Sequence, residues 1–204
     1  MYLYEEKYEN QRREGVLKLC KSNNYEFFAA DNGALLECYK NYEFSKKGNS
    51  GEIKNVVKVM NGEETVTLFE YKYTISGGRS SSTHYDTVVL LPAKDVPDFL
   101  LKPEGIHHKL YSLFGYQDFD FDSHPRFSDN YVLKAENELQ VRVFFEKGAL
   151  DYLDVAQGNQ IQVKNELVAI VFTERQPPQQ YLDRIHSACS IWKGICGAPG
   201  SLTV

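Results

Sequence analysis

The sequence predicts an α+β fold in which an antiparallel β-meander packs against a C-terminal amphipathic helix and one or two internal helices. β-Rich segments separated by turn residues occupy residues 53–91, and an apolar stripe runs along the last helix between Pro177 and Gly197. Of the 204 residues, 42% are apolar, 25% charged and 13% aromatic, as in an ordinary globular protein. A chain of this length can bury a large core.

The N-terminal residues 3–22 are rich in helix formers and predict a charged helix, which we assign to a separate segment, residues 1–24. Residues 25–204 are expected to form a single α+β domain. Two short β-prone pieces open this domain, at residues 25–29 and 35–44. The turn signal Asp31-Asn32-Gly33 separates them.

The clearest β signal begins at residue 53. Asn61-Gly62, a strong hairpin dipeptide, lies between two β-rich runs, and a third run covers residues 84–91. Four side chains alternate on one face of the second run and are expected to point inward: Phe69, Tyr71, Tyr73 and Ile75. A mobile loop is expected at residues 76–82.

The second half predicts further elements in chain order. They are a strand at 99–102, a helical turn at 106–116, a strand at 131–134, a helix or two helices over 136–155 broken near Gly148, and a hairpin of 161–163 with 167–172. The apolar stripe of the last helix consists of Leu182, Ile185, Cys189, Trp192 and Cys196. This stripe predicts a buried helix.

The four cysteines, Cys20, Cys38, Cys189 and Cys196, form no C-x-x-C pair and have no histidine beside them at zinc-ligand spacing. Cys189 and Cys196 would lie about 10.5 Å apart along a helix, whereas a disulfide needs Cα atoms within about 7 Å. Reduced thiols are therefore expected. No structural zinc is expected.

Charge and hydropathy narrow the range of partners. Twenty-three Lys and Arg residues oppose 28 Asp and Glu residues, for a formal net charge of −5, so nucleic acid is not an expected partner. No segment reaches the roughly 18 apolar residues of a membrane span, and the N-terminus lacks the apolar stretch of a signal peptide. We therefore expect a cytoplasmic protein without a membrane span.

One acidic segment carries the candidate site residues, Asp118, Asp120, Asp122 and His124, which alternate with Phe119 and Phe121. In extended backbone the polar groups share one face, where three carboxylates could hold a divalent cation. The spacing matches no EF-hand loop. The favoured interpretation is a structural acidic edge anchored by the two rings. A cation site and a binding surface are the alternatives.

A second segment contains the residue types of a hydrolytic triad. His84 and Asp86 lie close to the serines of residues 80–82, but no G-x-S-x-G nucleophile turn is present. The glycines and serines at 77–82 are typical of a hairpin tip rather than a phosphate cradle. His186 lies off the last helix's stripe and is interpreted as a flanking residue.

Several strings, among them TLFEYKYT at 67–74, LFG at 113–115 and DFDFDSHPRFS at 118–128, resemble a family of uncharacterised bacterial proteins. The resemblance covers about residues 25–175. It implies no established activity, cofactor or catalytic residue. Many members of that family are membrane-tethered through an apolar N-terminal helix, whereas the N-terminal helix of this chain is charged.

These observations favour a non-enzymatic interaction or accessory module with an unidentified protein partner and no cofactor. Two other functions are carried as alternatives. The first is a metal-dependent hydrolase that uses Asp118, Asp120, Asp122 and His124. The second is a small-ligand binder with its pocket on the aromatic face of Tyr71 and Tyr73.

Overall fold

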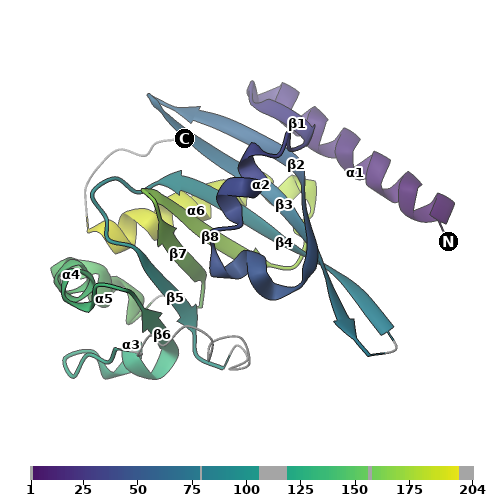
Figure 1. The fold of residues 1–204 in the computed structure, drawn as a ribbon. Coiled ribbons are helices and arrows are strands. Elements are labelled where there is room, and N and C mark those ends of the chain that lie inside the picture. Colours follow the sequence, from purple (N-terminus) through teal and green to yellow (C-terminus); the bar gives the residue numbers. More distant parts are fainter. Residues whose placement is uncertain (1, 79, 106–118, 156–157, 198–204) are drawn as a thin grey trace. The chain divides into compact units, whose positions relative to one another are not determined.

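The computed structural model describes residues 2–78, 80–105, 119–155 and 158–197 (Figure 1). These residues form eight strands, joined by antiparallel ladders, together with helices that include a C-terminal one, so the predicted α+β class is confirmed. The chain divides into two compact units. The first unit comprises Met1–Leu90 with Phe172–His186, and the second comprises Leu91–Val171 with Ser187–Thr203. Whether residues 25–204 act as one domain stays a prediction.

A four-stranded antiparallel meander forms the centre of the first unit, in the order β1-β2-β3-β4. The strands are β1 (Glu26–Ala30), β2 (Asn49–Asn61), β3 (Glu64–Gly77) and β4 (Ser80–Pro92). Gly62 turns between β2 and β3 with a φ of 63°, a conformation that glycine adopts without strain. The predicted hairpins are confirmed. The loop bounds expected at 76–82 are too wide, because Ser76 pairs with Ser81 and Gly77 with Ser80. The mobility of this hairpin tip stays a prediction.

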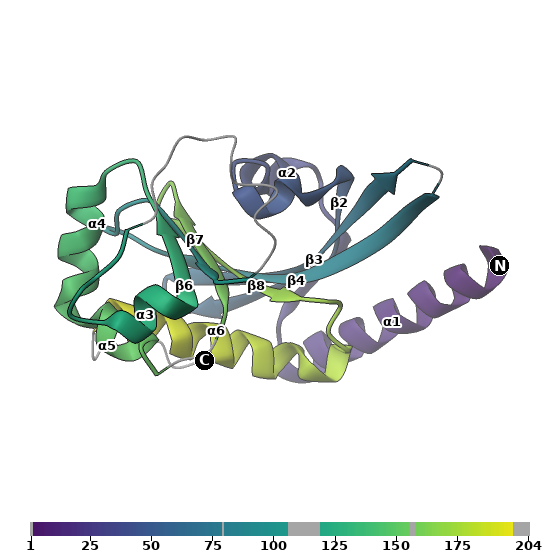
Figure 2. The same cartoon turned by 90° about the horizontal axis from the view of Figure 1, so that it is seen from below.

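Two helices cover opposite faces of this meander, as Figure 2 shows: α1 (Tyr2–Asn23) on one face and α2 (Ala34–Tyr39) on the other. The C-terminal half of α1 packs through Val16 and Cys20, which are buried. Tyr8, in the N-terminal half, is 52% exposed. None of the helices within the described ranges is long and apolar enough to cross a membrane.

The strand expected at residues 35–44 is wrong. The Asp31 carboxylate accepts hydrogen bonds from the backbone N–H groups of Gly33, Leu35 and Leu36, at 3.0, 3.2 and 2.8 Å. A carboxylate that satisfies these otherwise unpaired donors starts a helix. The chain therefore forms α2 and then the 3-10 helix η1 (Glu43–Lys47).

Strand β3 is buried on both faces in its middle. Phe69, Tyr71 and Tyr73 are buried on one face, as predicted, but Ile75 is 42% exposed. The β3–β4 hairpin extends beyond α2, the helix whose Tyr39 packs on this face (Figure 2). On the opposite face Leu68 and Glu70 are fully buried. A buried carboxylate in this position requires charged partners.

The second unit contains strands in the order β8-β7-β5-β6. They are β5 (Phe99–Pro103), β6 (Tyr131–Lys134), β7 (Gln160–Lys164) and β8 (Leu167–Thr173). All four were predicted. Asn165 and Glu166 connect β7 to β8 with φ values of 52° and 59°, as a two-residue hairpin turn requires.

The helices of the second unit agree with the predicted break near Gly148. The segment contains α4 (Glu138–Phe144), the π-helix η3 (Phe145–Ala149) and α5 (Leu150–Leu153), and Gly148 has a φ of 133°. It is preceded by α3 (Pro125–Asn130). The helical turn expected at 106–116 lies outside the described residues.

The C-terminal helix α6 (Tyr181–Cys196) follows the short 3-10 helix η4 (Pro178–Gln180), close to its predicted start. Ile185, Cys189 and Trp192 are buried along the predicted stripe, whereas Leu182 and Cys196 at its two ends are partly exposed. All four cysteines are free thiols, as expected. Burial raises the pKa of Cys20 and of Cys196 to about 11, so these thiols stay protonated at neutral pH.

Candidate functional site

The acidic segment is described from Phe119 onward, and Asp118 lies outside the described residues. The rings of Phe119 and Phe121 are each 4% exposed, so their predicted burial is confirmed. Phe121 packs against Phe127, with ring centroids 5.6 Å apart. The two rings therefore anchor this segment.

The polar groups of the same segment point toward solvent or bind neighbouring side chains. Asp120 and Asp122 are exposed. His124 Nε2 lies 3.1 Å from Asp151 Oδ1, and its Nδ1 lies 2.9 Å from the Ser123 hydroxyl oxygen. Within the described ranges, no group of three or more His, Cys, Asp or Glu side chains is placed to hold a metal ion. The four-residue cation site includes Asp118 and stays a hypothesis.

The side chains of Ser82, His84 and Asp86 share one face of β4 but do not assemble a triad. His84 Nε2 lies 2.7 Å from the Ser82 hydroxyl oxygen. Asp86 instead pairs with Lys47, whose Nζ lies 2.6 Å from its Oδ2. Ser82 is exposed on an open strand. The Asp86 carboxylate therefore forms an ion pair with Lys47 and does not orient His84, as the acid of a triad would.

The aromatic face of β3 is filled by protein side chains. Tyr39, on α2, contacts Phe69 and Tyr71, with ring centroids 5.2 and 4.9 Å apart. The Tyr71 hydroxyl donates a 2.7 Å hydrogen bond to the Ser45 carbonyl. Burial raises the pKa of Tyr39 well above its usual value. This face is core, so the ligand pocket hypothesised on Tyr71 and Tyr73 is occupied by the protein itself.

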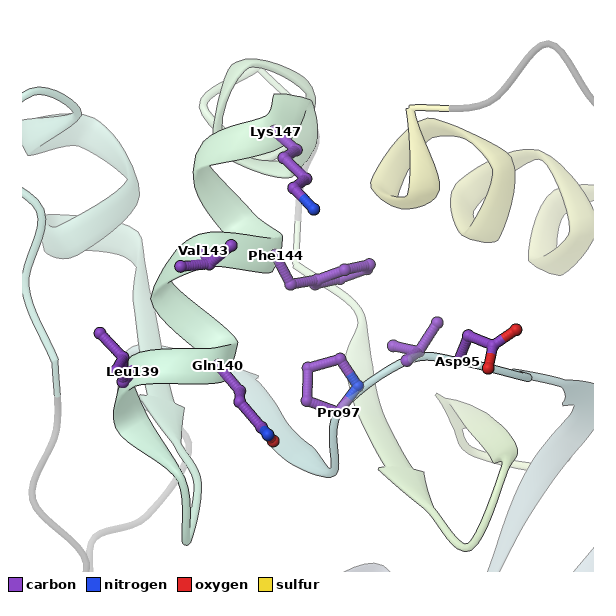
Figure 3. A pocket seen from close by; sticks show the side chains of 8 residues that line it. Asp95, Pro97, Leu139, Gln140, Val143, Phe144 and Lys147 are labelled. Carbon is purple, nitrogen blue, oxygen red and sulfur yellow. The ribbon is translucent and has the colours of Figure 1, made fainter.

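A groove of about 540 Å³ lies in the second unit between α4 with η3 and the loop that connects β4 to β5. We call it the α4 groove (Figure 3). The helical side contributes Leu139, Gln140, Val143, Phe144 and Lys147. The loop contributes Asp95, Val96 and Pro97. Its volume falls within the range of ligand-binding clefts.

Two aliphatic side chains at the α4 groove are strongly exposed. Leu139 is 74% exposed and Val143 47%, and they lie four residues apart, on successive turns of one helix face. The core-facing residues of the same helical segment are Val141 and Phe145, both fully buried. The segment is therefore apolar on a core face and on part of its outer face.

The local sequence explains why this surface is presented. The Asn137 side chain accepts a 3.2 Å hydrogen bond from the Gln140 N–H and caps the start of α4. Pro97 restricts the facing loop, and Asp95 adopts a φ of 59°. Both walls of the α4 groove are thus locally constrained.

The two charged side chains at the α4 groove, Lys147 and Asp95, are both exposed. In the part of the chain that the structure describes, neither forms an ion pair. Sequence reasoning missed this site. The available signal was the i,i+4 pair Leu139 and Val143, which lies on a different helix face from the buried Val141 and Phe145.

Comparisons of the chain with protein-family models, with curated proteins and with solved structures found no match.

Proposed function

We propose that the protein is a non-enzymatic interaction module whose α4 groove binds a short apolar peptide segment of a partner protein. The observation that carries this proposal is the placement of Leu139 and Val143, both highly exposed, beside a cleft of about 540 Å³. Contiguous exposed apolar surface of this kind costs solubility unless a partner covers it.

The dimensions of the groove suit a short extended segment. From Leu139 to Lys147 the helix rises about 12 Å at 1.5 Å per residue. An extended chain advances about 3.3 Å per residue, so about four residues span this length. One apolar side chain of such a segment would contact the Phe144 ring, which points toward Pro97 (Figure 3), and a second would contact Val143, which also lines the groove.

Charge specifies the preferred peptide further. The Lys147 ammonium lacks a carboxylate partner within the described ranges, so an acidic residue or a C-terminal carboxylate beside the apolar residues would pair with it. Such a pair at a solvent-exposed rim contributes modestly to affinity and more to selectivity. We therefore propose an acidic, apolar peptide as the partner segment.

A selection from a random peptide library against the full-length protein tests this function. The enriched peptides are expected to share two apolar positions and one acidic position. In fluorescence anisotropy titrations with a selected peptide, Val143→Ser should weaken binding at least about tenfold, which corresponds to about 1.4 kcal/mol. Lys147→Gln should remove the preference for the acidic position.

Val155→Ser is the matched control, because Val155 is 76% exposed and does not line the α4 groove. This variant should bind the selected peptide like the wild type. The proposal is wrong if the library yields no peptide, or if Val143→Ser and Val155→Ser behave alike.

A further inference from the structure

The structure assigns a second binding site, for a small apolar carboxylate, to a pocket of the first unit between β1, β2, β3 and α2. We call it the β1–α2 pocket. It has a volume of about 380 Å³, and the residues that decide its chemistry are Phe28, Asp31, Leu35, Cys38, Val56 and Lys58. It is separate in residues and ligand class from the α4 groove.

Apolar side chains from three elements line the β1–α2 pocket. Val56 on β2 is buried, and Leu35 on α2 is partly exposed. Phe28 on β1 is 45% exposed and leaves part of its ring open to solvent. Exposed aromatic surface beside a cavity of ligand size is typical of a small-molecule site.

The two charged residues that line the pocket differ in whether their charge already has a partner in the protein. The Asp31 carboxylate is occupied, because it accepts three backbone hydrogen bonds at the start of α2. The Lys58 ammonium lies 5.3 Å from the centroid of the Phe28 ring and has no ion-pair partner among the residues that the structure describes. Glu26 on β1 is opposite Lys58 in the strand register, but its carboxylate forms no ion pair with the Lys58 ammonium.

A ligand that complements this arrangement carries one carboxylate and one apolar body. The carboxylate would pair with Lys58, and the apolar body would contact Phe28, Leu35 and Val56. A carboxylate–ammonium interaction is stronger than a neutral hydrogen bond, so the charge should distinguish an acid from its amide. The pocket volume limits the ligand to a small ring system or a short acyl chain.

The test uses the full-length protein and 2-naphthoic acid as the probe, with 2-naphthamide as its uncharged analogue. In fluorescence titrations the acid should bind at least about tenfold more tightly than the amide. Lys58→Gln should weaken the binding of the acid by about the same factor and leave the binding of the amide unchanged. Bound acid should also slow the alkylation of Cys38 by iodoacetamide, measured by mass spectrometry, because Cys38 lines the pocket.

Lys54→Gln is the matched control. Lys54 lies four residues earlier on β2 and is paired with Glu52 at 3.4 Å, outside the pocket lining. This variant should bind both probes like the wild type. The inference is overturned if the acid does not bind, if acid and amide bind equally, if Lys54→Gln has the same effect as Lys58→Gln, or if saturating acid leaves the alkylation rate of Cys38 unchanged.

Discussion

The Nε of Arg12 lies 2.6 Å from Oε1 of Glu70, and both side chains are buried. The second oxygen of Glu70 accepts a 2.7 Å hydrogen bond from Arg175 Nε, and the Tyr181 hydroxyl donates to Oε1. Arg175 also pairs with Glu9. Two arginines therefore face two glutamates, and the network joins α1, β3 and the segment around η4.

Replacing Glu70 with glutamine should destabilise the protein by about 3–5 kcal/mol. The substitution keeps the shape of the side chain but leaves Arg12 and Arg175 without their shared buried carboxylate. The free energy of unfolding can be measured by urea denaturation. Glu37→Gln is the control, because the ion pair between Glu37 and Lys40 is largely exposed. This substitution should lower the free energy of unfolding by less than about 1 kcal/mol. Equal losses in the two variants would contradict the structural role of the network.

The contribution of Glu9 should depend on pH. Its hydrogen bond from Arg175 lowers the pKa of Glu9 below the usual value of 4.5, against the opposing effect of burial. A carboxylate with a depressed pKa stabilises the fold above its unfolded-state pKa and loses this contribution as pH falls through its folded-state pKa. The stability difference between wild type and Glu9→Gln should therefore be full above pH 4.5 and shrink below it.

Urea melts of both proteins between about pH 7 and pH 3 measure this difference. Glu14→Gln, an exposed substitution on the same helix, controls for the removal of one surface carboxylate. A difference between wild type and Glu9→Gln that grows toward low pH would show that the sign is wrong.

Truncating Trp192 to alanine should cost about 3–5 kcal/mol, because the ring is 4% exposed at the centre of the α6 stripe and its removal leaves a cavity. His186→Ala, an exposed substitution on the same helix, should change stability by about 0.5 kcal/mol or less. The free energies of unfolding of the two variants can be measured by denaturant unfolding. A loss below about 1 kcal/mol for Trp192→Ala would contradict its role in the core.

In the acidic segment, replacing a buried ring should lower the stability of the protein much more than replacing an exposed carboxylate. Phe121→Ala should cost about 3 kcal/mol or more, because the ring is buried against Phe127 and Phe145. Asp120→Asn should change stability by only about 0.5 kcal/mol, as is usual for an exposed side chain. Urea melts of both variants provide the comparison. Similar losses would contradict the anchoring role of the ring.

The cation hypothesis for Asp118, Asp120, Asp122 and His124 has its own measurement. Thermal melts of chelator-treated protein should show no saturable stabilisation by Mg²⁺, Ca²⁺, Mn²⁺ or Zn²⁺ that Asp120→Asn abolishes. A bound cation would raise the melting temperature by mass action. A saturable increase in the wild type that is lost in the variant would instead support the metal-dependent hydrolase.

Elements whose signals are local could be predicted from the sequence. Gly62 marks the β2–β3 turn because the first central position of that turn has a positive φ, which glycine adopts without strain, whereas Asn61 is the last residue of β2 and pairs with Glu64. The stripe around Trp192 marks α6 because its spacing matches one helix face. The failure at residues 35–44 has a physical reason as well. Asp31-Asn32-Gly33 is compatible with a turn or a helix start, and β propensity alone did not decide between them.

The candidate binding surfaces depended on tertiary structure. The sequence predicted that Leu139, Val143 and Lys147 lie in one helical segment, which the structure divides between α4 and η3, and that Phe28 and Lys58 occupy β-prone segments. Only the fold decided that Leu139 and Val143 line the same groove as the loop that carries Pro97, and that residues of α2 line the same pocket as Phe28 and Lys58. The same holds for Glu70, which reads as an exposed strand residue until Arg12 and Arg175 approach it from segments 58 and 105 positions away. Helical and strand periodicity arise from interactions between near neighbours, whereas a cavity or a buried charge network requires residues that only chain folding brings together.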